Sequence, residues 1–293
     1  MAPLTICRIY IVGLFLMLLK ISTSVEIDEN IKKYIKITVR KYEEGSYTQE
    51  FSEIRPDRPK ISKCCSPLSF TLPNLFIWDP LLQFHDMFDL NPLVCEEHGH
   101  VVVPARWTDG SSNSLNPRVL LEDNGPALLV ARDYYCKAGH NRHYIRSTDG
   151  DFLRYLSESY FVDLPFKLTH KCGFTLAFVK RLRSYISHGL SFNMFQSTYM
   201  EHQLEYCMEK KWEFQRNCDL RRKLFDQAIQ EYLKESTEEL FSTFQDFLIR
   251  MCPSDDLLCD IFLKDFQDGK VDFEESMRST SARALMADHT FKV

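Results

Sequence analysis

The sequence predicts an α+β fold, in which a small β-rich module over residues 64–150 precedes a mainly helical region over residues 151–280. Two patterns predict this arrangement. In the first region short apolar runs alternate with turn residues, whereas in the second region apolar residues recur every three or four positions. The composition, 44% hydrophobic and 13% aromatic over 293 residues, is sufficient for a buried core and excludes a disordered chain.

Residues 1–24 have the layout of a signal peptide or hydrophobic leader. Arg8 precedes the apolar run 9–19, and small residues follow at 22–24. The run is shorter than the roughly 20 residues that a membrane span needs, so no span is expected. A buried helix or a chance hydrophobic start is the alternative. We expect a secreted protein if this leader is a true signal, and otherwise a nuclear or cytoplasmic one.

The segment 25–63 is expected to form an accessory strand or helix followed by a linker. The apolar positions of this segment follow no single period, and Pro56 and Pro59 break regular structure shortly before residue 60. The β-rich module begins after this boundary.

Three extended segments are expected in the β-rich module. They are a proline-bounded segment at 72–80, a β-branched run at 101–103, and a run at 127–131 that Tyr134 and Tyr135 extend. Between the second and third, Trp107 precedes the Asp109-Gly110 pair, which is typical of a turn.

Helical periodicity dominates from residue 151 onward. Phe174, Phe178, Leu182 and Tyr185 recur at helical spacing, and Gly189 then predicts a helix end. A second apolar stripe consists of Leu220, Leu224, Phe225, Ala228, Ile229, Tyr232 and Leu233. A further helix through Phe244, Phe247 and Leu248 ends before Pro253, and Ser254 is the expected N-cap of the next.

Two cysteine–histidine pairs in the β-rich module predict a metal site. Cys95 and His98 form the first pair, and Cys136 and His140 form the second. Two thiolates and two imidazoles are a ligand set of structural zinc, and four protein ligands leave no open position for catalysis. His100 and His143 are spare imidazoles that could replace His98 or His140. The alternative is buried cysteines with no metal.

The number of cysteines does not indicate a protein held together by disulfides. The chain has ten cysteines, and cleavage of a leader containing Cys7 would leave an odd number. The sequence leaves open the disulfide state of six of them, namely Cys64, Cys65, Cys207, Cys218, Cys252 and Cys259.

The net charge of −5 excludes a uniformly basic nucleic-acid binder, so any DNA contact must be local. The helical region carries basic clusters that could bind phosphates, and an ordinary solvated helix face is the alternative. The candidate contacts are Lys180, Arg181, Arg183, Arg221, Arg222 and Lys223. The chain has no glycine-rich phosphate loop and no hydrolase motif, so no small-molecule substrate is expected.

The chain resembles the N-terminal part of a family of transposase-derived proteins, which combine a zinc-binding head with a ribonuclease H-like core. The resemblance spans residues 64–293. Its motifs are the segments 72–80, 107–112, 117–118, 136–140, 165–166, 170–175, 253–258, 261–266 and 288–292. The first ligand pair of this chain departs from the family pattern. Two cysteines are typical at these positions in the family, whereas this chain has Cys95 and His98.

The resemblance implies that residues 281–293 form the first strand of a truncated ribonuclease H-like core. Asp288 would be its first metal-binding carboxylate, and the chain ends soon afterwards. We therefore expect Asp288 to be vestigial and the chain not to be an enzyme.

The expected function is that of a non-catalytic, transposase-derived fragment that binds zinc. Its helical region would contact DNA, a protein partner or a second copy of the chain. The alternative is a secreted or extracellular-matrix protein that carries this fragment behind a signal peptide.

Overall fold

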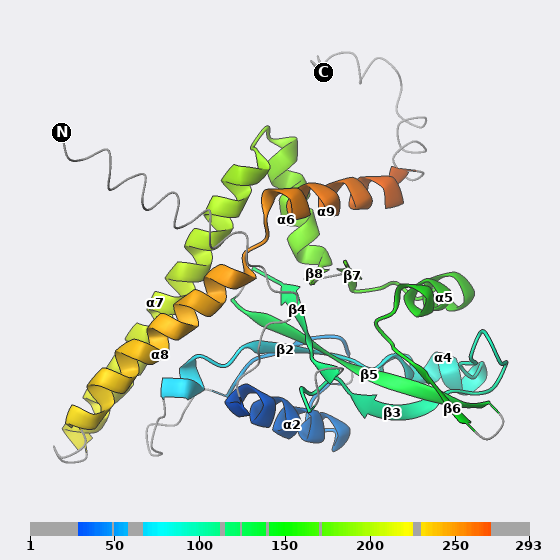
Figure 1. Ribbon diagram of the computed structural model, residues 1–293, viewed down its shortest axis with the longest axis horizontal. Coiled ribbons are helices and arrows are strands. Elements are labelled where there is room, and N and C mark those ends of the chain that lie inside the picture. The colour runs from blue at the N-terminus through cyan, green and yellow to red at the C-terminus, as the bar shows by residue number, and fades with distance from the viewer. Residues whose placement is uncertain are drawn as a thin grey trace.

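The computed structural model describes residues 29–48, 50–57, 67–111, 115–123, 125–138, 141–169, 172–224 and 230–270. These residues form a mixed α+β structure around one curled, open sheet (Figure 1). The predicted α+β class is thereby confirmed. The predicted leader, Cys64, Cys65 and the segment with Asp288 lie outside the described residues.

The sheet is organised around its longest strand, β5. The strands are β1 (Glu53–Ile54), β2 (Asn74–Trp78), β3 (Val103–Trp107), β4 (Arg118–Leu121), β5 (Ala127–Ala138), β6 (Asn141–Ile145), β7 (Phe166–Leu168) and β8 (Gly173–Thr175). The first half of β5 pairs with β2 in parallel and with β4 antiparallel. Its second half pairs antiparallel with β3 and β6, so the three strands form a ribbon beyond the main sheet (Figure 1).

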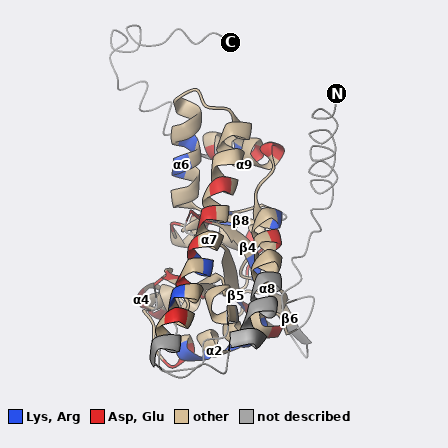
Figure 2. Cartoon of the chain, turned by 90° about the vertical axis from the view of Figure 1, so that its left-hand side faces the viewer, with Lys and Arg blue, Asp and Glu red and all other residues tan. Residues whose placement is uncertain are grey.

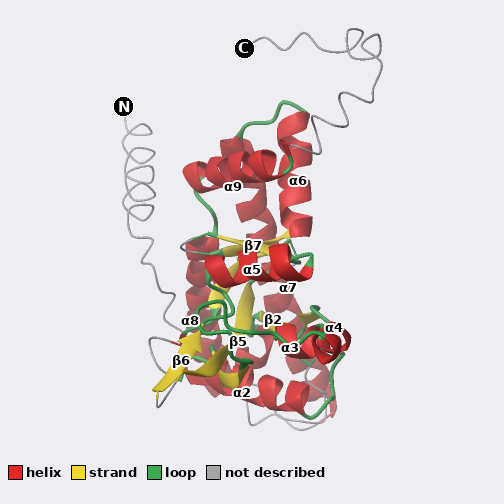
Figure 3. Ribbon diagram, turned by 90° about the vertical axis from the view of Figure 1, so that its right-hand side faces the viewer, coloured by secondary structure: helices red, strands yellow, loops and turns green. Residues whose placement is uncertain are grey.

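Helices cover both faces of the sheet and stand beside it. They are α2 (Glu29–Glu43), the 3-10 turn η1 (Pro67–Phe70), α3 (Pro80–Gln83), α4 (His85–Leu90), α5 (Gly150–Tyr160), α6 (Leu176–Ser187), α7 (Phe192–Leu224), α8 (Gln230–Met251) and α9 (Asp255–Asp268). Helices α7 and α8 form a long hairpin, and α6 and α9 pack at its upper end (Figures 1 and 3).

The alternation of side chains along the strands explains the two layers. Leu128 and Val130 of β5 pack against α2, whereas Leu129 and Ala131 belong to the core under α5. Successive side chains of a strand point to opposite faces, so a continuously apolar strand must be buried on both.

Several predicted elements are confirmed by these bounds. The proline-bounded segment forms β2, and the run at 127–131 extends past Tyr135 as β5. In α9 the hydroxyl of Ser254 accepts a hydrogen bond from the Leu257 amide, which is the predicted N-cap. Gly189 follows α6 with a positive φ of 80°, as a helix end requires.

The sheet extends beyond the predicted β-rich module at both ends. Strand β1 precedes residue 64, and β7 and β8 follow residue 150. Strands of two or three residues are too short to show a sequence period. Helix α2 also shares a core with the sheet, through Ile35, Val39 and Tyr42.

Two other segments also differ from the sequence expectation. The strand expected at 101–103 begins at Val103 and continues to Trp107. The stripe from Leu220 to Leu233 is divided between the end of α7 and the start of α8, and residues 225–229 between them lie outside the described residues.

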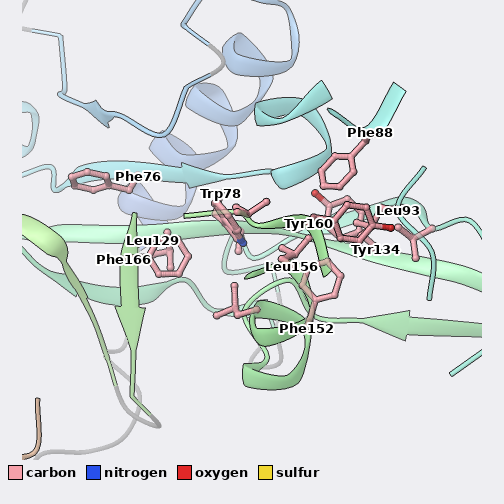
Figure 4. Packing of buried hydrophobic residues seen from close by; sticks show 14 of the residues in the cluster. Phe76, Trp78, Phe88, Leu93, Leu129, Tyr134, Phe152, Leu156, Tyr160 and Phe166 are labelled. Carbon is pink, nitrogen blue, oxygen red and sulfur yellow. The ribbon is translucent and has the colours of Figure 1, made fainter. Parts of the chain in front are cut away.

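An aromatic cluster joins distant segments under the sheet (Figure 4). The Trp78 ring is fully buried and lies 5.0 Å from the Phe166 ring, centroid to centroid. The Phe51 ring lies 6.2 Å from the Trp78 ring and 5.3 Å from the Phe166 ring, so the three rings contact one another. The Trp78 indole NH donates to the carbonyl of Ser147 at 3.1 Å, so its polar atom is also satisfied.

Asp79, at the end of β2, is a buried carboxylate with a testable effect on stability. The Tyr134 hydroxyl donates to it at 2.6 Å, yet burial raises the pKa of Asp79 above its ordinary value. The protonated carboxyl is therefore favoured by folding. Its stabilisation is present below the unfolded pKa of about 3.9 and is lost as the pH rises through the folded pKa.

We expect Asp79→Asn, which keeps the acceptor and removes the charge, to raise the unfolding free energy at pH 7 by about 1 kcal/mol. Urea unfolding at pH 7 and pH 4.5 measures this, and the gain should shrink at the lower pH. A variant that is less stable than wild type by the same amount at both values would contradict the reasoning.

Candidate metal centre

A tight loop between α4 and β3 places Cys95 and His98 on the same side of the chain. The Cys95 amide donates to the carbonyl of His100 at 2.8 Å, and the Gly99 amide donates to the carbonyl of Cys95 at 2.7 Å. Gly99 has a φ of 66°, which residues with a Cβ rarely adopt. A bridge between Val94 and Val101 closes this loop.

The β5–β6 pairing supplies the other two groups. Its antiparallel register places Cys136 directly opposite His143. Directly opposed residues of an antiparallel pair lie on the same face, with Cβ atoms about 5 Å apart. Two ligands therefore come from the ribbon and two from the loop.

The four side chains converge on one point. Their ligand atoms, the two Sγ atoms and one nitrogen of each imidazole, all lie within 4.8 Å of one another. The Cys95 Sγ lies 3.5 Å from His98 Nδ1 and 3.6 Å from His143 Nδ1. The Cys136 Sγ lies 3.7 and 3.8 Å from the same two atoms.

These separations agree with a tetrahedral zinc site. Bond lengths of about 2.3 Å to sulfur and about 2.05 Å to nitrogen, at the tetrahedral angle, give a sulfur–nitrogen edge of about 3.6 Å. All four measured sulfur–nitrogen distances lie close to this value. The cluster could therefore hold a metal ion with little movement of the side chains.

The thiols face the core and the imidazoles face solvent. Cys95 and Cys136 are 3% and 0% exposed and pack with Phe88, Leu93 and Val102. Burial raises the pKa of the Cys136 thiol, and the neighbouring Cys95 adds to the shift. Without a metal this thiol is therefore protonated at neutral pH.

Glu97 supports one imidazole from outside the cluster. Its carboxylate lies 3.4 Å from Nε2 of His143, while Nδ1 of the same ring faces the thiols. A proton held on Nε2 by the carboxylate leaves the Nδ1 lone pair available to a metal. This carboxylate–histidine contact is common around metal-bound histidines.

Three of the four predicted ligands, Cys95, His98 and Cys136, belong to this cluster, and its fourth group is His143, which the sequence offered as a substitute. His140, the predicted ligand, lies outside the described residues. The register of the hairpin was the missing signal, because it determines which residue of β6 faces Cys136.

The basic residues of α6 make contacts within the chain. Arg181 pairs with Asp123 at 2.9 Å. Arg183 pairs with the buried Asp265, to which its Nε donates at 3.0 Å. Lys180 is exposed on the same helix.

Acidic partners therefore offset much of the positive charge on α6, and α7 carries residues of both signs (Figure 2). The other three candidate phosphate contacts, Arg221, Arg222 and Lys223, lie at the end of α7, where the side chains are outside the described part of the chain.

Within the described ranges, Cys95, Cys136, Cys207, Cys252 and Cys259 have no disulfide partner. Within the same ranges, no helix combines the length and the apolar character needed to cross a membrane.

Comparisons of the chain with protein-family models, curated proteins and solved structures give no match. The resemblance to transposase-derived proteins remains a prediction from the sequence.

Proposed function

We propose that this chain is a non-enzymatic binding module, stabilised by a structural zinc ion and derived from the N-terminal part of a transposase. The convergence of Cys95, His98, Cys136 and His143 within 4.8 Å carries the proposal. Four protein ligands complete a tetrahedral shell and leave no position for a substrate or a reactive water.

Zinc is the metal that this donor set favours. Two thiolates and two imidazoles in tetrahedral arrangement are typical of zinc, whereas magnesium and calcium take oxygen ligands. The ion would tie the 95–98 loop to the β5–β6 hairpin, two segments that are distant in sequence.

The proposed transposase ancestry is supported by the ordered motifs of residues 64–293, and it implies a nucleic-acid or protein partner. Exposed apolar residues on the α7–α8 hairpin favour a protein partner or a second copy of the chain. Met208 and Trp212, one turn apart on α7, are 46% and 63% exposed. The alternative to this proposal is a secreted protein whose cysteines are oxidised.

Replacement of His143 tests the ligand set directly. We expect His143→Ala to abolish the binding of one zinc ion per chain, because three ligands remain. His140→Ala and His100→Ala should retain full zinc content. Metal analysis of the purified proteins by plasma mass spectrometry is the measurement.

Each outcome has a clear meaning. Zinc loss in His140→Ala with retention in His143→Ala would restore the ligand set expected from the sequence. A wild-type protein without zinc, after refolding with the metal, would contradict the proposed function.

A further inference from the structure

The face of the β3–β5–β6 ribbon that points away from the metal site carries aromatic and basic side chains. Because neighbouring residues of a strand face opposite ways, Tyr135 and Tyr144 point away from Cys136 and His143. We call this surface the outer ribbon face. Val103, Tyr135 and Tyr144 are cross-strand neighbours on it, Arg106 lies over the Tyr144 ring, and Arg146 interacts with the same Asp133 as Arg106. The ribbon projects from the main sheet (Figures 1 and 3).

The aromatic rings of this face are accessible and ordered by their neighbours. Tyr144 is 46% exposed, and its ring lies 6.2 Å from that of Tyr135. The guanidinium of Arg106 lies over the Tyr144 ring at 4.8 Å. Val103, opposite Tyr135 on β3, is 38% exposed. A held, half-exposed ring beside an arginine is a platform on which a flat group can stack.

The described basic side chains of the outer ribbon face are Arg106 and Arg146, and its acidic residue is Asp133. The Asp133 side chain is 2% exposed and pairs with Arg106 at 3.5 Å. The chain carries −5 overall, so this positive surface is local.

The acidic groups near the face offset its charge in part. Asp133 pairs with Arg106 and also interacts with Arg146, but it is only 2% exposed, so the two guanidinium groups face solvent and the carboxylate does not. Glu97 lies on the other side of the ribbon, against His143. Asp149 is exposed nearby and interacts with Arg118.

We infer that the outer ribbon face binds single-stranded nucleic acid, with Tyr144 stacking on a base and Arg106 and Arg146 contacting phosphates. Exposed aromatic rings interleaved with arginines bind unpaired bases with little sequence preference. Paired bases are already stacked on each other, which favours single strands as the ligand. This inference deepens the proposed function, since zinc holds the ribbon that presents the face.

Binding of a fluorescent oligothymidylate of about 15 nucleotides to the zinc-loaded full chain, measured by anisotropy, tests the inference. We expect salt-sensitive binding, weakened about tenfold by Tyr144→Ala, because a stacked base contributes this much to affinity. Arg146→Gln should lower the slope of log affinity against log salt by about 0.7, the value for one phosphate contact on a single strand.

Matched controls lie away from the ribbon. Phe266→Ala removes an exposed ring from α9, and Arg154→Gln removes an exposed charge from α5, and both should bind like wild type. Zinc content and the thermal midpoint of every variant are measured first, so a folding defect is distinguished from a binding defect.

Three results would overturn the inference while leaving the zinc proposal intact. These are zinc-loaded wild type that binds no oligonucleotide at low salt, Tyr144→Ala that binds like wild type, and equal or tighter binding of a duplex or of polyglutamate. A protein that binds the oligonucleotide as expected but contains no zinc would contradict the zinc proposal alone.

Discussion

Removal of zinc by a chelator is expected to lower the thermal midpoint of unfolding by about 10 °C. Free zinc at a thousand times its dissociation constant stabilises the folded state by about 4 kcal/mol. In a domain of this size each kcal/mol shifts the midpoint by about 2–4 °C. Calorimetry or circular dichroism, with and without chelator, provides the measurement.

Replacement of a single zinc ligand should lower the thermal midpoint as much as removal of zinc by a chelator. Cys136→Ser is expected to unfold near the midpoint of the chelated wild type, and chelator should then have little further effect. Cys207→Ser, which alters a buried thiol on α7 outside the cluster, should keep the full response to chelator. A chelator effect of equal size in Cys136→Ser and in wild type would show that zinc acts elsewhere.

The zinc-dependent part of the stability should also depend on pH. Burial raises the pKa of the Cys136 thiol, so zinc must displace a proton that is held more tightly than usual. The difference in midpoint between metal-loaded and chelated protein should therefore be larger at pH 8 than at pH 6.

Local sequence patterns predicted the elements that depend on neighbouring residues. The N-cap at Ser254, the glycine at the end of α6 and the short apolar run that begins β5 are signals that extend over a few positions, and each could be recognised in the sequence. The parallel pairing of β2 with β5 joins strands about 50 residues apart, and no local signal specifies it.

The candidate site shows the same limit at the scale of single residues. The Cys95–His98 pair lies within one loop and was predicted, whereas the choice of His143 depends on the register of β5 with β6. The ion-pair partner of Arg183 could not be predicted from the sequence either, because Asp265 lies on another helix far along the chain. Spacing predicts the ligand types, and register determines which residues meet.

Two of the three tryptophans of the chain, Trp78 and Trp212, should differ widely in their effect on stability. We expect Trp78→Ala to lower the unfolding free energy by about 3–5 kcal/mol, the usual loss for a large aromatic side chain in a core. The substitution leaves a cavity beside Phe51 and Phe166 and removes the hydrogen bond to Ser147.

Trp212→Ala is the matched control, since its ring is 63% exposed on α7 and its loss should change stability by less than about 0.5 kcal/mol. Urea unfolding followed by circular dichroism avoids dependence on tryptophan fluorescence. Similar effects of the two substitutions would contradict the packing.

The size of the Trp78 effect also bears on whether the predicted β-rich module can fold alone. The Trp78 ring contacts Phe51, which precedes residue 64, and Phe166, which follows residue 150. A fragment of residues 64–150 would lose both contacts while keeping all four metal ligands. If Trp78→Ala is as costly as its burial predicts, the loss of these contacts would offset most of the stabilisation that zinc provides, and we expect the sheet with its flanking segments to be the folding unit.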